Sequence, residues 1–466
     1  MIFKTWPWQH WRAERRDAVA LRTSQESFTW RQLCERVDAL AAGFYQQGVR
    51  EGAGVALCAK NSPQAVFAWL ALLQCGARVL PLNPQLPAPL LAQLLPALSL
   101  EHALVCGEAL PPPGLPLLAW HEEGDCVHAA GWQPERFASM TLTSGSTGLP
   151  KAAVHSAAAH LASAAGVLGE IPFAGGDCWL LSLPLYHVSG QGIFWRWLLA
   201  GASLATRESQ PLAQALAGCT HASLVPTQLW RLLEEKVAIP SLKAVLLGGA
   251  AIPVELTEAA DQRGIACWCG YGLTEFASTV CAKKADGRKD VGFALAGREV
   301  KIVNGEIWLR GASMAAGYWR DGGVQPLTNR EGWFATRDRG VWLGDRLCVP
   351  GRLDNLFFSG GEGIQPEEVE RVIAAHPQVR QAFVVPLEDK EFGHRPVAVV
   401  ECEEGAPPEA LALWVRDKLA RFQQPVRWLA LPESIKNGGI KISRRQLSQW
   451  VVNELSPFAE RESATV

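Results

Sequence analysis

One short run of this sequence is dense in residues that hold phosphate, the run TSGSTGLPK at 143–151. Glycines let the backbone come close to an anion, hydroxyl groups donate to phosphate oxygens, and a lysine adds positive charge. The run is not a P-loop of the NTPase type, because no glycine precedes Lys151 and no serine or threonine follows it. A solvent-exposed turn is the plain alternative. The predicted phosphate ligands are Thr143, Ser144, Gly145, Ser146, Thr147, Gly148 and Lys151.

Two further runs have residue types that suit a nucleotide and its metal ion. The run GYGLTE at 270–275 presents an aromatic ring, a hydroxyl and a carboxylate on a glycine turn, and carboxylates suit the hard Mg²⁺ ion. The run Gly248-Gly249-Ala250 follows a predicted strand, and on its own it indicates only a turn. Asp338 is a lone aspartate, a residue that usually forms turns or caps.

The elements around these runs follow an alternating pattern. Strands are predicted at 54–58, 77–82, 138–143, 222–225 and 243–247. One helix is predicted at 64–75, a second begins at about 156, and a third follows the strand at 222–225 and runs through 235. Such alternation predicts an α/β fold with parallel or mixed sheets and flanking helices. After about residue 290 the segments 297–310 and 340–349 predict a small β-rich module. A compact α+β stretch follows residue 351, with a helix from 366, strands near 382–385 and 396–400, and a helix at 408–420.

Composition limits the partners of the chain. Its 466 residues suffice for two or three domains, and 44 basic residues against 46 acidic ones give no reason to expect nucleic acid as a partner. No uncharged apolar run approaches the ~20 residues of a membrane helix. The polar start of the chain favours a cytoplasmic protein, so the twelve cysteines are expected to be reduced thiols. Cys267 and Cys269 lack zinc-site spacing and are expected to be buried thiols.

Over nearly the whole chain these runs resemble, in the same order, the adenylate-forming superfamily of acyl-CoA synthetases, adenylation domains and luciferases. The resemblance implies a large N-terminal domain, 1–352, with the ATP and acid sites, and a small mobile C-terminal domain, 353–466, with a hinge near Asp354. It implies ATP, CoA and Mg²⁺ as the small molecules bound, and a homo-oligomer is possible in such a family. The reaction implied is formation of an acyl-adenylate, followed by transfer of the acyl group to a thiol.

The resemblance also implies roles for single residues. Tyr271, between Gly270 and Gly272, would stack on adenine, with the 248–250 segment beside it. Thr274 would contact the adenylate phosphate, and Glu275 would hold Mg²⁺. Asp338 would bind the ribose hydroxyls, and Arg352 would contact the ribose and phosphate side.

The C-terminal part resembles the family at two more places. Ser359, Gly360 and Gly361 match a loop that lines the thiol tunnel, although Gly363 stands where the family usually has Asn. Lys441, in NGGIKISR, matches the catalytic lysine, although Ile440 replaces the usual glycine before it. Lys436 is a nearby rival, and the pattern that continues after Lys441 favours Lys441.

The acid pocket is predicted at the run LPLYHVSGQ, 183–191, where His187 would border the carboxylate being activated or would be an ordinary core histidine. In the apolar run that follows, the charge of Arg196 needs a partner, either a structural carboxylate or a second carboxylate on the substrate. The stretch 187–198 resembles that of family members that activate an aromatic dicarboxylate. The residues predicted to hold such an acid are His187, Ser189, Gln191, Arg196 and Ser223.

Other functions fit the same motifs. An aryl- or medium-chain acyl-CoA ligase would share the nucleotide site and differ in the acid pocket. A stand-alone adenylation domain would share the first step and pass the acyl group to a carrier protein instead of free CoA. A degenerate member that binds nucleotide without turnover is disfavoured, because Glu275, Asp338, Arg352 and Lys441 are all present.

Overall fold

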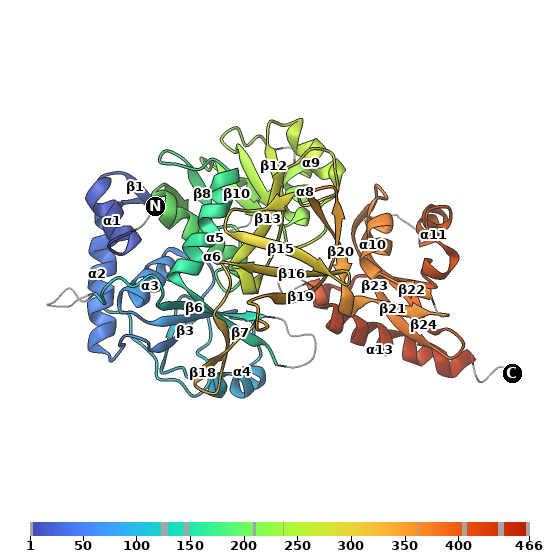
Figure 1. Ribbon diagram of the computed structural model, residues 1–466, viewed down its shortest axis with the longest axis horizontal. Coiled ribbons are helices and arrows are strands. Elements are labelled where there is room, and N and C mark those ends of the chain that lie inside the picture. Colours follow the sequence, from blue (N-terminus) through green and yellow to red (C-terminus); the bar gives the residue numbers. More distant parts are fainter. Residues whose placement is uncertain are drawn as a thin grey trace. The chain divides into compact units, whose positions relative to one another are not determined.

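The computed structural model describes residues 3–122, 129–143, 149–207, 211–235, 237–360, 362–402, 408–436 and 442–462 (Figure 1). The chain divides into two compact units, Met1–Val300 with Leu309–Phe334, and Lys301–Trp308 with Ala335–Val466. Each is described by itself below, as unit 1 and unit 2. The boundary between functional domains near residue 353 stays a prediction.

Within its described residues, unit 1 contains a nine-stranded sheet. Strands β8 to β12 run parallel where they pair, whereas β13 and β14 add antiparallel at one edge and β2 adds antiparallel at the other. In spatial order the strands are β14 (Phe293–Ala294), β13 (Ser278–Lys284), β12 (Ala266–Leu273), β11 (Ala244–Leu247), β10 (His221–Leu224), β8 (Cys178–Leu180), β9 (Ser203–Ala205), β1 (Val19–Arg22) and β2 (Ser27–Thr29).

A second, seven-stranded sheet lies in the described part of the same unit. Its strands are, in spatial order, β18 (Gly323–Gln325), β17 (Gly317–Arg320), β7 (Lys151–Ser156), β6 (Phe137–Thr143), β4 (Arg78–Leu82), β3 (Gly54–Cys58) and β5 (His102–Val105). Strands β3 and β4 are parallel and buried along their whole length, as expected for central strands covered on both faces. The predicted βαβ unit is confirmed here. Its helix α3 (Pro63–Gln74) begins with Pro63 after the N-cap Ser62, whose Oγ accepts from the Ala65 amide.

The α/β fold class is confirmed, with mixed sheets. Sequence reasoning expected the strand ending at 143 to pass through a loop straight into a helix. Instead, β7 returns antiparallel to β6, with Thr143 opposite Lys151, before α5 (Ala157–Glu170) begins. This strand was missed because all four residues 152–155 are buried, so buried and exposed residues do not alternate along it.

Helices α5 and α6 (Val188–Ala200) form a layer between the two sheets (Figure 1). Helix α5 contacts both β7 and β13, and α6 contacts α5, β8 and β13. The N-cap Ser156 starts α5, and Gly201 ends α6 in a left-handed conformation with φ of 62°. The other helices of unit 1 are α1 (Pro7–Glu14), α2 (Trp30–Gln46), α4 (Ala88–Leu94), η1 (Leu95–Leu98), α7 (Leu212–Ala215), α8 (Pro226–Glu234), α9 (Val254–Asp261) and η2 (Thr274–Phe276).

Unit 2 contains the α+β stretch that the sequence predicted after residue 351. Its sheet has the order β22-β21-β24-β23 with β25 beside β24, and α10 contacts β23. A four-stranded sheet, β15-β16-β19-β20, contains the points at which the chain passes between the units. The remaining elements are β15 (Arg298–Val303), β16 (Glu306–Gly311), β19 (Phe334–Leu343), β20 (Arg346–Arg352), η3 (Leu353–Asn355), β21 (Phe357–Ser359), β22 (Glu362–Ile364), α10 (Pro366–Ala374), β23 (Val379–Asp389), β24 (Gly393–Cys402), α11 (Pro408–Arg416), η4 (Arg421–Gln423), β25 (Arg427–Ala430), α12 (Glu433–Lys436) and α13 (Arg444–Glu462).

The cysteines that the structure describes are free thiols, and all of them except Cys348 and Cys402 are buried. Burial raises the pKa of Cys75 and of Cys267 to about 12. Cys267 and Cys269 lie on β12 and are buried, as predicted. These thiols are therefore neutral near pH 7 and pack as small apolar side chains.

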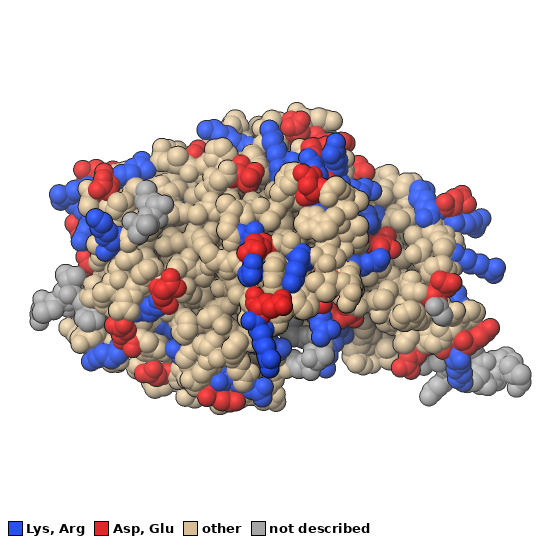
Figure 2. Space-filling model, in the orientation of Figure 1, with Lys and Arg blue, Asp and Glu red and all other residues tan. Residues whose placement is uncertain are grey.

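The surface of the described part carries charges of both signs. On the face drawn in Figure 2, Lys and Arg side chains lie interspersed with Asp and Glu side chains. None of the helices in the described ranges has the length and apolar character needed to cross a membrane.

Two buried histidines lie between the sheets of unit 1. His155 on β7 and His160 on α5 have ring centroids 5.0 Å apart, and His160 stacks on Trp195 of α6. Nε2 of His160 lies 2.7 Å from the Ser139 hydroxyl. Burial lowers the pKa of His155 to about 4 and that of His160 well below 6.5. Both rings are therefore neutral in the folded protein at pH 7.

This burial predicts a loss of stability in mild acid. The unfolded chain takes up a proton at His155 below pH ~6.5, and the folded chain does so only near pH 4. The free energy of unfolding therefore decreases as the pH falls from ~6.5 toward 4. The expected slope is about 1.4 kcal/mol per pH unit for this histidine. Urea unfolding at pH 7.5 and 5 should show a shallower loss for His155→Asn than for wild type. Equal slopes would contradict the prediction.

Candidate active site

The predicted phosphate loop connects two strands of one hairpin in unit 1. Thr143 ends β6 and Lys151 begins β7, and the two residues pair directly across the hairpin. Residues Ser144, Gly145, Ser146, Thr147 and Gly148 lie outside the described part of the chain. The Lys151 side chain is exposed, and its Nζ lies 4.9 Å from the ring centroid of Tyr318 on β17.

The predicted adenine and metal residues lie at the end of β12 and the start of η2. Strand β17, which pairs with β7 of the hairpin, contacts them through the hydrogen bond from Tyr318 to Glu275. Gly270, Tyr271 and Gly272 are the three residues before Leu273, which ends this strand, and Thr274 and Glu275 begin the short helix η2. A Cβ on Gly272 would lie 1.9 Å from the Ser278 carbonyl oxygen, so glycine is required there. This close approach lets the chain turn back immediately into β13.

The segment 248–250 follows the neighbouring strand β11, where Leu247 pairs with Cys269 of β12. Gly249 has φ of 82°, a left-handed conformation that favours glycine, and both Gly249 and Ala250 are exposed. An ideal Cβ on Gly248 would lie 3.5 Å from the Gly270 carbonyl oxygen. The structure therefore brings the two glycine runs together. The family resemblance implied that both border adenine, and that role stays a prediction.

Glu275 is held at both its backbone and its side chain. Its carbonyl oxygen accepts from the Ala315 amide at 2.8 Å, and its Oε1 accepts from the Tyr318 hydroxyl at 2.6 Å. The carboxylate is half-buried, so an oxygen atom remains able to meet a ligand. A partly exposed carboxylate beside glycine turns fits a hard divalent cation that bridges phosphates. Its role as the Mg²⁺ ligand stays a prediction.

Arg196 lies in the middle of α6 and is 2% exposed. Its Nε donates to the Gly192 carbonyl at 2.8 Å, and its Nη1 donates to the Ser223 hydroxyl on β10 at 3.2 Å. The guanidinium carbon lies 4.6 Å from a ring centroid of Trp179. Gly192 leaves room for this arrangement, since a Cβ there would lie 2.7 Å from Arg196 Nη2.

The charge of Arg196 has no carboxylate partner among the described residues. Burial lowers its pKa, which reflects the cost of holding a cation away from water. Of the two alternatives left open by the sequence, a structural carboxylate is therefore not found in the described part of the chain. A buried, unneutralised guanidinium with a serine hydroxyl beside it is suited to receive a carboxylate from a ligand.

The other predicted acid residues surround the start of α6. His187 is the N-cap residue of this helix, and its ring lies 4.9 Å from that of Tyr186. Ser189 is half-buried. Gln191 is completely buried, and its Nε2 donates to Thr141 at 2.9 Å and to the Leu185 carbonyl at 3.1 Å. Gln191 thus links α6 to β6, and its contact with the acid stays a prediction.

Sequence reasoning did not single out Ser278, which the structure places near Gly192 of α6. Its Cβ and Oγ lie 3.1 Å from the position of a Cβ on Gly192, and Arg196 Nη2 lies 2.7 Å from the same position. Ala277 and Ser278 have φ of 49° and 105°, unusual values for residues other than glycine. The Ser163 hydroxyl holds this turn by donating to the Ala277 carbonyl at 2.7 Å. The only signal in the sequence was the position of Ser278 three residues after Glu275.

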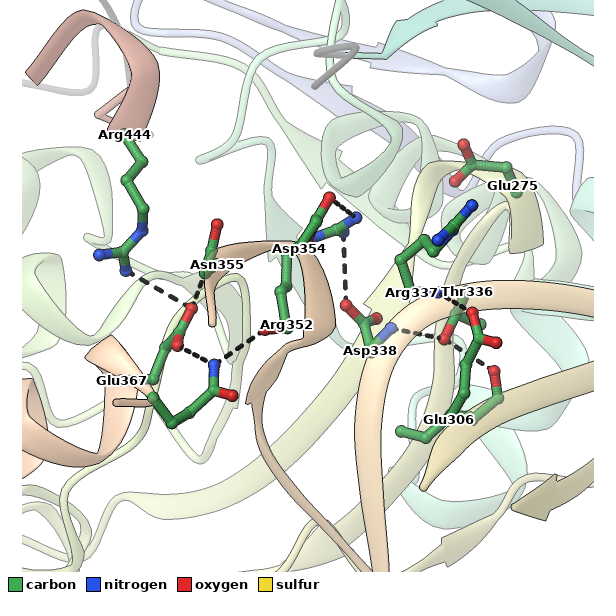
Figure 3. A network of polar contacts seen from close by, with 12 residues as sticks. Glu275, Glu306, Thr336, Arg337, Asp338, Arg352, Asp354, Asn355, Glu367 and Arg444 are labelled. Carbon is green, nitrogen blue, oxygen red and sulfur yellow. Dashed lines mark hydrogen bonds and ion pairs between the residues drawn. The ribbon is translucent and has the colours of Figure 1, made fainter. Parts of the chain in front are cut away.

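In unit 2, Arg352 joins two of the predicted residues (Figure 3). Asp338 on β19 pairs with Arg352 on β20, and Arg352 Nη1 lies 3.3 Å from an Asp338 oxygen. The same guanidinium binds Asp354 with two hydrogen bonds, Nε to Oδ1 at 2.8 Å and Nη2 to Oδ2 at 3.1 Å. The predicted ribose residue, the predicted phosphate-side arginine and the predicted hinge residue therefore form one ion-pair network.

A second cluster of contacts holds the chain that follows Asp354, the predicted hinge residue. Gln365 donates to the Arg352 carbonyl at 2.8 Å, and both Gln365 and Asn355 donate to the Glu367 carboxylate (Figure 3). Arg444, at the start of α13, lies 3.5 Å from the same carboxylate and also binds Glu370. The start of α13 is thus anchored close after the segment that contains Lys441.

Of the predicted thiol-tunnel residues, the structure describes Ser359 and Gly360. Ser359 ends β21 and is 2% exposed, and its Oγ has no hydrogen-bond partner among the described residues. Gly360 is left-handed with φ of 57°, and its amide donates to the Phe392 carbonyl at 2.8 Å. Gly361 and the predicted catalytic Lys441 lie outside the described residues. The rival Lys436 forms ion pairs with Glu401 and Glu433.

Comparison with known proteins shows the family to which the chain belongs. A sequence profile of AMP-binding enzymes matches residues 8–319, and a profile of the AMP-binding enzyme C-terminal domain matches residues 368–438. The chain belongs to the AMP-binding enzyme family. It is 67% identical to 2-succinylbenzoate–CoA ligase of Salmonella typhimurium over 97% of this chain and 99% of that protein, and 68% identical to the Escherichia coli ligase of the same name at the same coverage.

Solved structures of this family have the same fold. An arginine-to-lysine variant of Escherichia coli MenE with bound OSB-AMS has a TM-score of 0.92 at 66% identity, covering 97% of this chain and 99% of that one. MenE of Bacillus subtilis in complex with ATP and magnesium ion has a TM-score of 0.81 at 25% identity, covering 92% and 96%. Its complex with the acyl-adenylate intermediate OSB-AMP has a TM-score of 0.84 at 25% identity, covering 96% and 98%.

The close approach at Gly272 predicts a specific defect in nucleotide binding. In Gly272→Ala the new methyl group meets a backbone oxygen, so the 270–276 turn must move, at a cost of about 1–3 kcal/mol. Affinity for AMP, measured by calorimetry, should fall while the cooperative unfolding transition remains. Gly323→Ala is the matched control, because a Cβ there has no atom within 4 Å. AMP binding at wild-type affinity by Gly272→Ala would contradict the assignment of this turn.

Proposed function

We propose that this chain is an ATP-dependent ligase that joins 2-succinylbenzoate to CoA. In the first step the acid and ATP give the acyl-adenylate and pyrophosphate, and in the second the adenylate and CoA give 2-succinylbenzoyl-CoA and AMP. The single observation that carries the choice of acid is Arg196, a buried cation without a carboxylate partner among the described residues. The close relatives named 2-succinylbenzoate–CoA ligase support the same choice.

The substrate matches this cation chemically. 2-Succinylbenzoate carries a succinyl carboxylate, which would be activated, and a benzoate carboxylate on an aromatic ring. A guanidinium held by the Gly192 carbonyl and the Ser223 hydroxyl is preorganised to receive the benzoate carboxylate, directly or through a water. Its burial makes the unliganded state costly, so a dianionic acid gains more than a neutral aromatic acid of similar size.

Adenylation has to bring an anion to a polyanion, so catalysis depends on positioning and on positive charge. Thr143 and Lys151 stand at the two ends of the phosphate loop, and Thr274 stands on η2 beside Glu275. Glu275 would hold Mg²⁺, which when bound would offset phosphate charge. His187 would orient the attacking succinyl carboxylate at the start of α6. Asp338 and Arg352 would bind the ribose side of the nucleotide.

The second step needs a path for the CoA thiol. Gly360 gives a narrow backbone segment beside Ser359, suited to a pantetheine arm, and Gly361 is predicted from the sequence to line the same tunnel. In the proposed cycle the C-terminal domain rotates at Asp354 between the steps, which takes Lys441 away and brings the 359–361 loop to the adenylate. Rotation at Asp354 would require its bidentate contact with Arg352 to rearrange. A homo-oligomeric state stays a prediction.

Lys441→Ala should separate the two steps. Loss of the ammonium group near the α-phosphate should abolish adenylate formation, whereas thioester formation from a supplied acyl-adenylate should be largely retained. Pyrophosphate release and CoA-thioester formation measure the two steps. Lys436→Ala is the matched control, because Lys436 is already paired with Glu401 and Glu433. Equal loss of both steps in Lys441→Ala would contradict its assignment.

Arg196→Ala tests the acid pocket. Removing the cation should raise the KM for 2-succinylbenzoate about tenfold or more, on the order of 1.4 kcal/mol, because the benzoate carboxylate loses its charged partner. The KM for ATP should change little. Steady-state kinetics measures both values, and an unchanged KM for the acid would remove Arg196 from the site.

The function itself is tested by CoA-thioester formation with ATP and Mg²⁺, comparing 2-succinylbenzoate with benzoate and a medium-chain fatty acid. A preference of at least about tenfold for 2-succinylbenzoate is expected from the charged pocket. Turnover with the monoacids alone would leave an acyl-CoA ligase of different specificity. Adenylate formation without transfer to free CoA would instead indicate a domain that loads a carrier protein.

A further inference from the structure

Tyr318 connects two residues of the nucleotide site, and the proposed function gives it no role. Its hydroxyl donates to Glu275 Oε1 at 2.6 Å, and its ring lies 4.9 Å from Lys151 Nζ. The three residues come from β17, η2 and β7, all within unit 1. A tyrosine therefore stands between the predicted metal ligand and the lysine that ends the predicted phosphate loop.

The pairing of β17 with β7 explains how this contact arises. Tyr318 lies directly opposite Ala153, and Lys151 is two residues away from Ala153 on the same face of the strand. A diagonal pair of this kind is within reach of long side chains. Three residues before Tyr318, the Ala315 amide donates to the Glu275 carbonyl. The segment 315–318 thus binds both the backbone carbonyl and the side-chain carboxylate of Glu275.

Tyr318 contacts two side chains of opposite charge, Glu275 and Lys151. A lysine and a glutamate at such a site attract one another, and a direct ion pair would occupy the carboxylate that a metal needs. The Tyr318 hydroxyl binds one oxygen of the carboxylate and leaves the other available to a metal. The ring face attracts the Lys151 ammonium group by a cation–π contact and so gives it a separate place.

We propose that Tyr318 is a positioning residue for the metal-bound nucleotide, orienting Glu275 toward Mg²⁺ through its hydroxyl and keeping Lys151 apart through its ring. This inference rests on the proposed ATP-dependent function and on Glu275 as the metal ligand. It assigns the hydroxyl and the ring of one side chain to different parts of the same ligand, the metal ion and the phosphates.

Two variants separate these roles. Tyr318→Phe removes the hydroxyl and keeps the ring, whereas Tyr318→Leu removes both. Titration calorimetry with MgATP, and with ATP in excess EDTA, measures binding without turnover. In Tyr318→Phe the affinity for MgATP should fall about tenfold, the scale of a hydrogen bond to a charged group, and the affinity for metal-free ATP should stay within about twofold. In Tyr318→Leu both affinities should fall.

Tyr45→Phe is the matched control, because Tyr45 lies on α2, where its ring contacts Arg50. The inference is overturned if Tyr318→Phe binds MgATP as tightly as wild type, or if it loses MgATP and metal-free ATP equally. It is also overturned if wild type binds MgATP no more tightly than ATP alone. Thioester formation by wild type tests the proposed function separately, so a failure of the acid assignment with an intact MgATP effect would leave the role of Tyr318 standing.

Discussion

The burial of α6 between two sheets is the constraint on which the proposed acid site depends. The helix is apolar over most of its length, so hydrophobic burial favours its central position, and this position takes Arg196 out of water. Its Nε and Nη1 are then satisfied by Gly192 and Ser223, but its charge is not neutralised within the described residues. An anionic ligand that binds beside this buried cation would neutralise its charge, so the site favours anions over neutral ligands.

Much of the fold was predictable because its elements are local. The buried strands β3 and β4 and the capped helix α3 have short sequence signatures, and these are confirmed. Strand β7 was missed because residues 152–155 are all buried, so buried and exposed residues do not alternate along it. The sheet that contains β7 is mixed, since β6 and β7 are antiparallel whereas β3 and β4 are parallel.

Candidate site residues could be proposed from the sequence where they lie inside a dense motif, and not where they reach the candidate site through tertiary contacts. Glu275 and Arg196 stand out by type and setting, whereas Ser278 and Tyr318 are ordinary residues until β13 brings Ser278 near Gly192 and β17 brings Tyr318 to Glu275. The lone Asp338 rested on family resemblance, and the structure adds its ion pair with Arg352. Ionic networks of this kind join residues distant in sequence, which no local pattern encodes.

The buried cysteines bear on a hazard that an enzyme of this proposed kind would face. An acyl-adenylate is an electrophile that would acylate any accessible thiolate, including thiolates of the protein that makes it. Burial raises the pKa of Cys34, Cys58 and Cys75 to about 12, and it also shields these sulfur atoms from contact with a bound intermediate. At these three positions the chain can therefore use thiols for packing without exposing them to acylation by the intermediate.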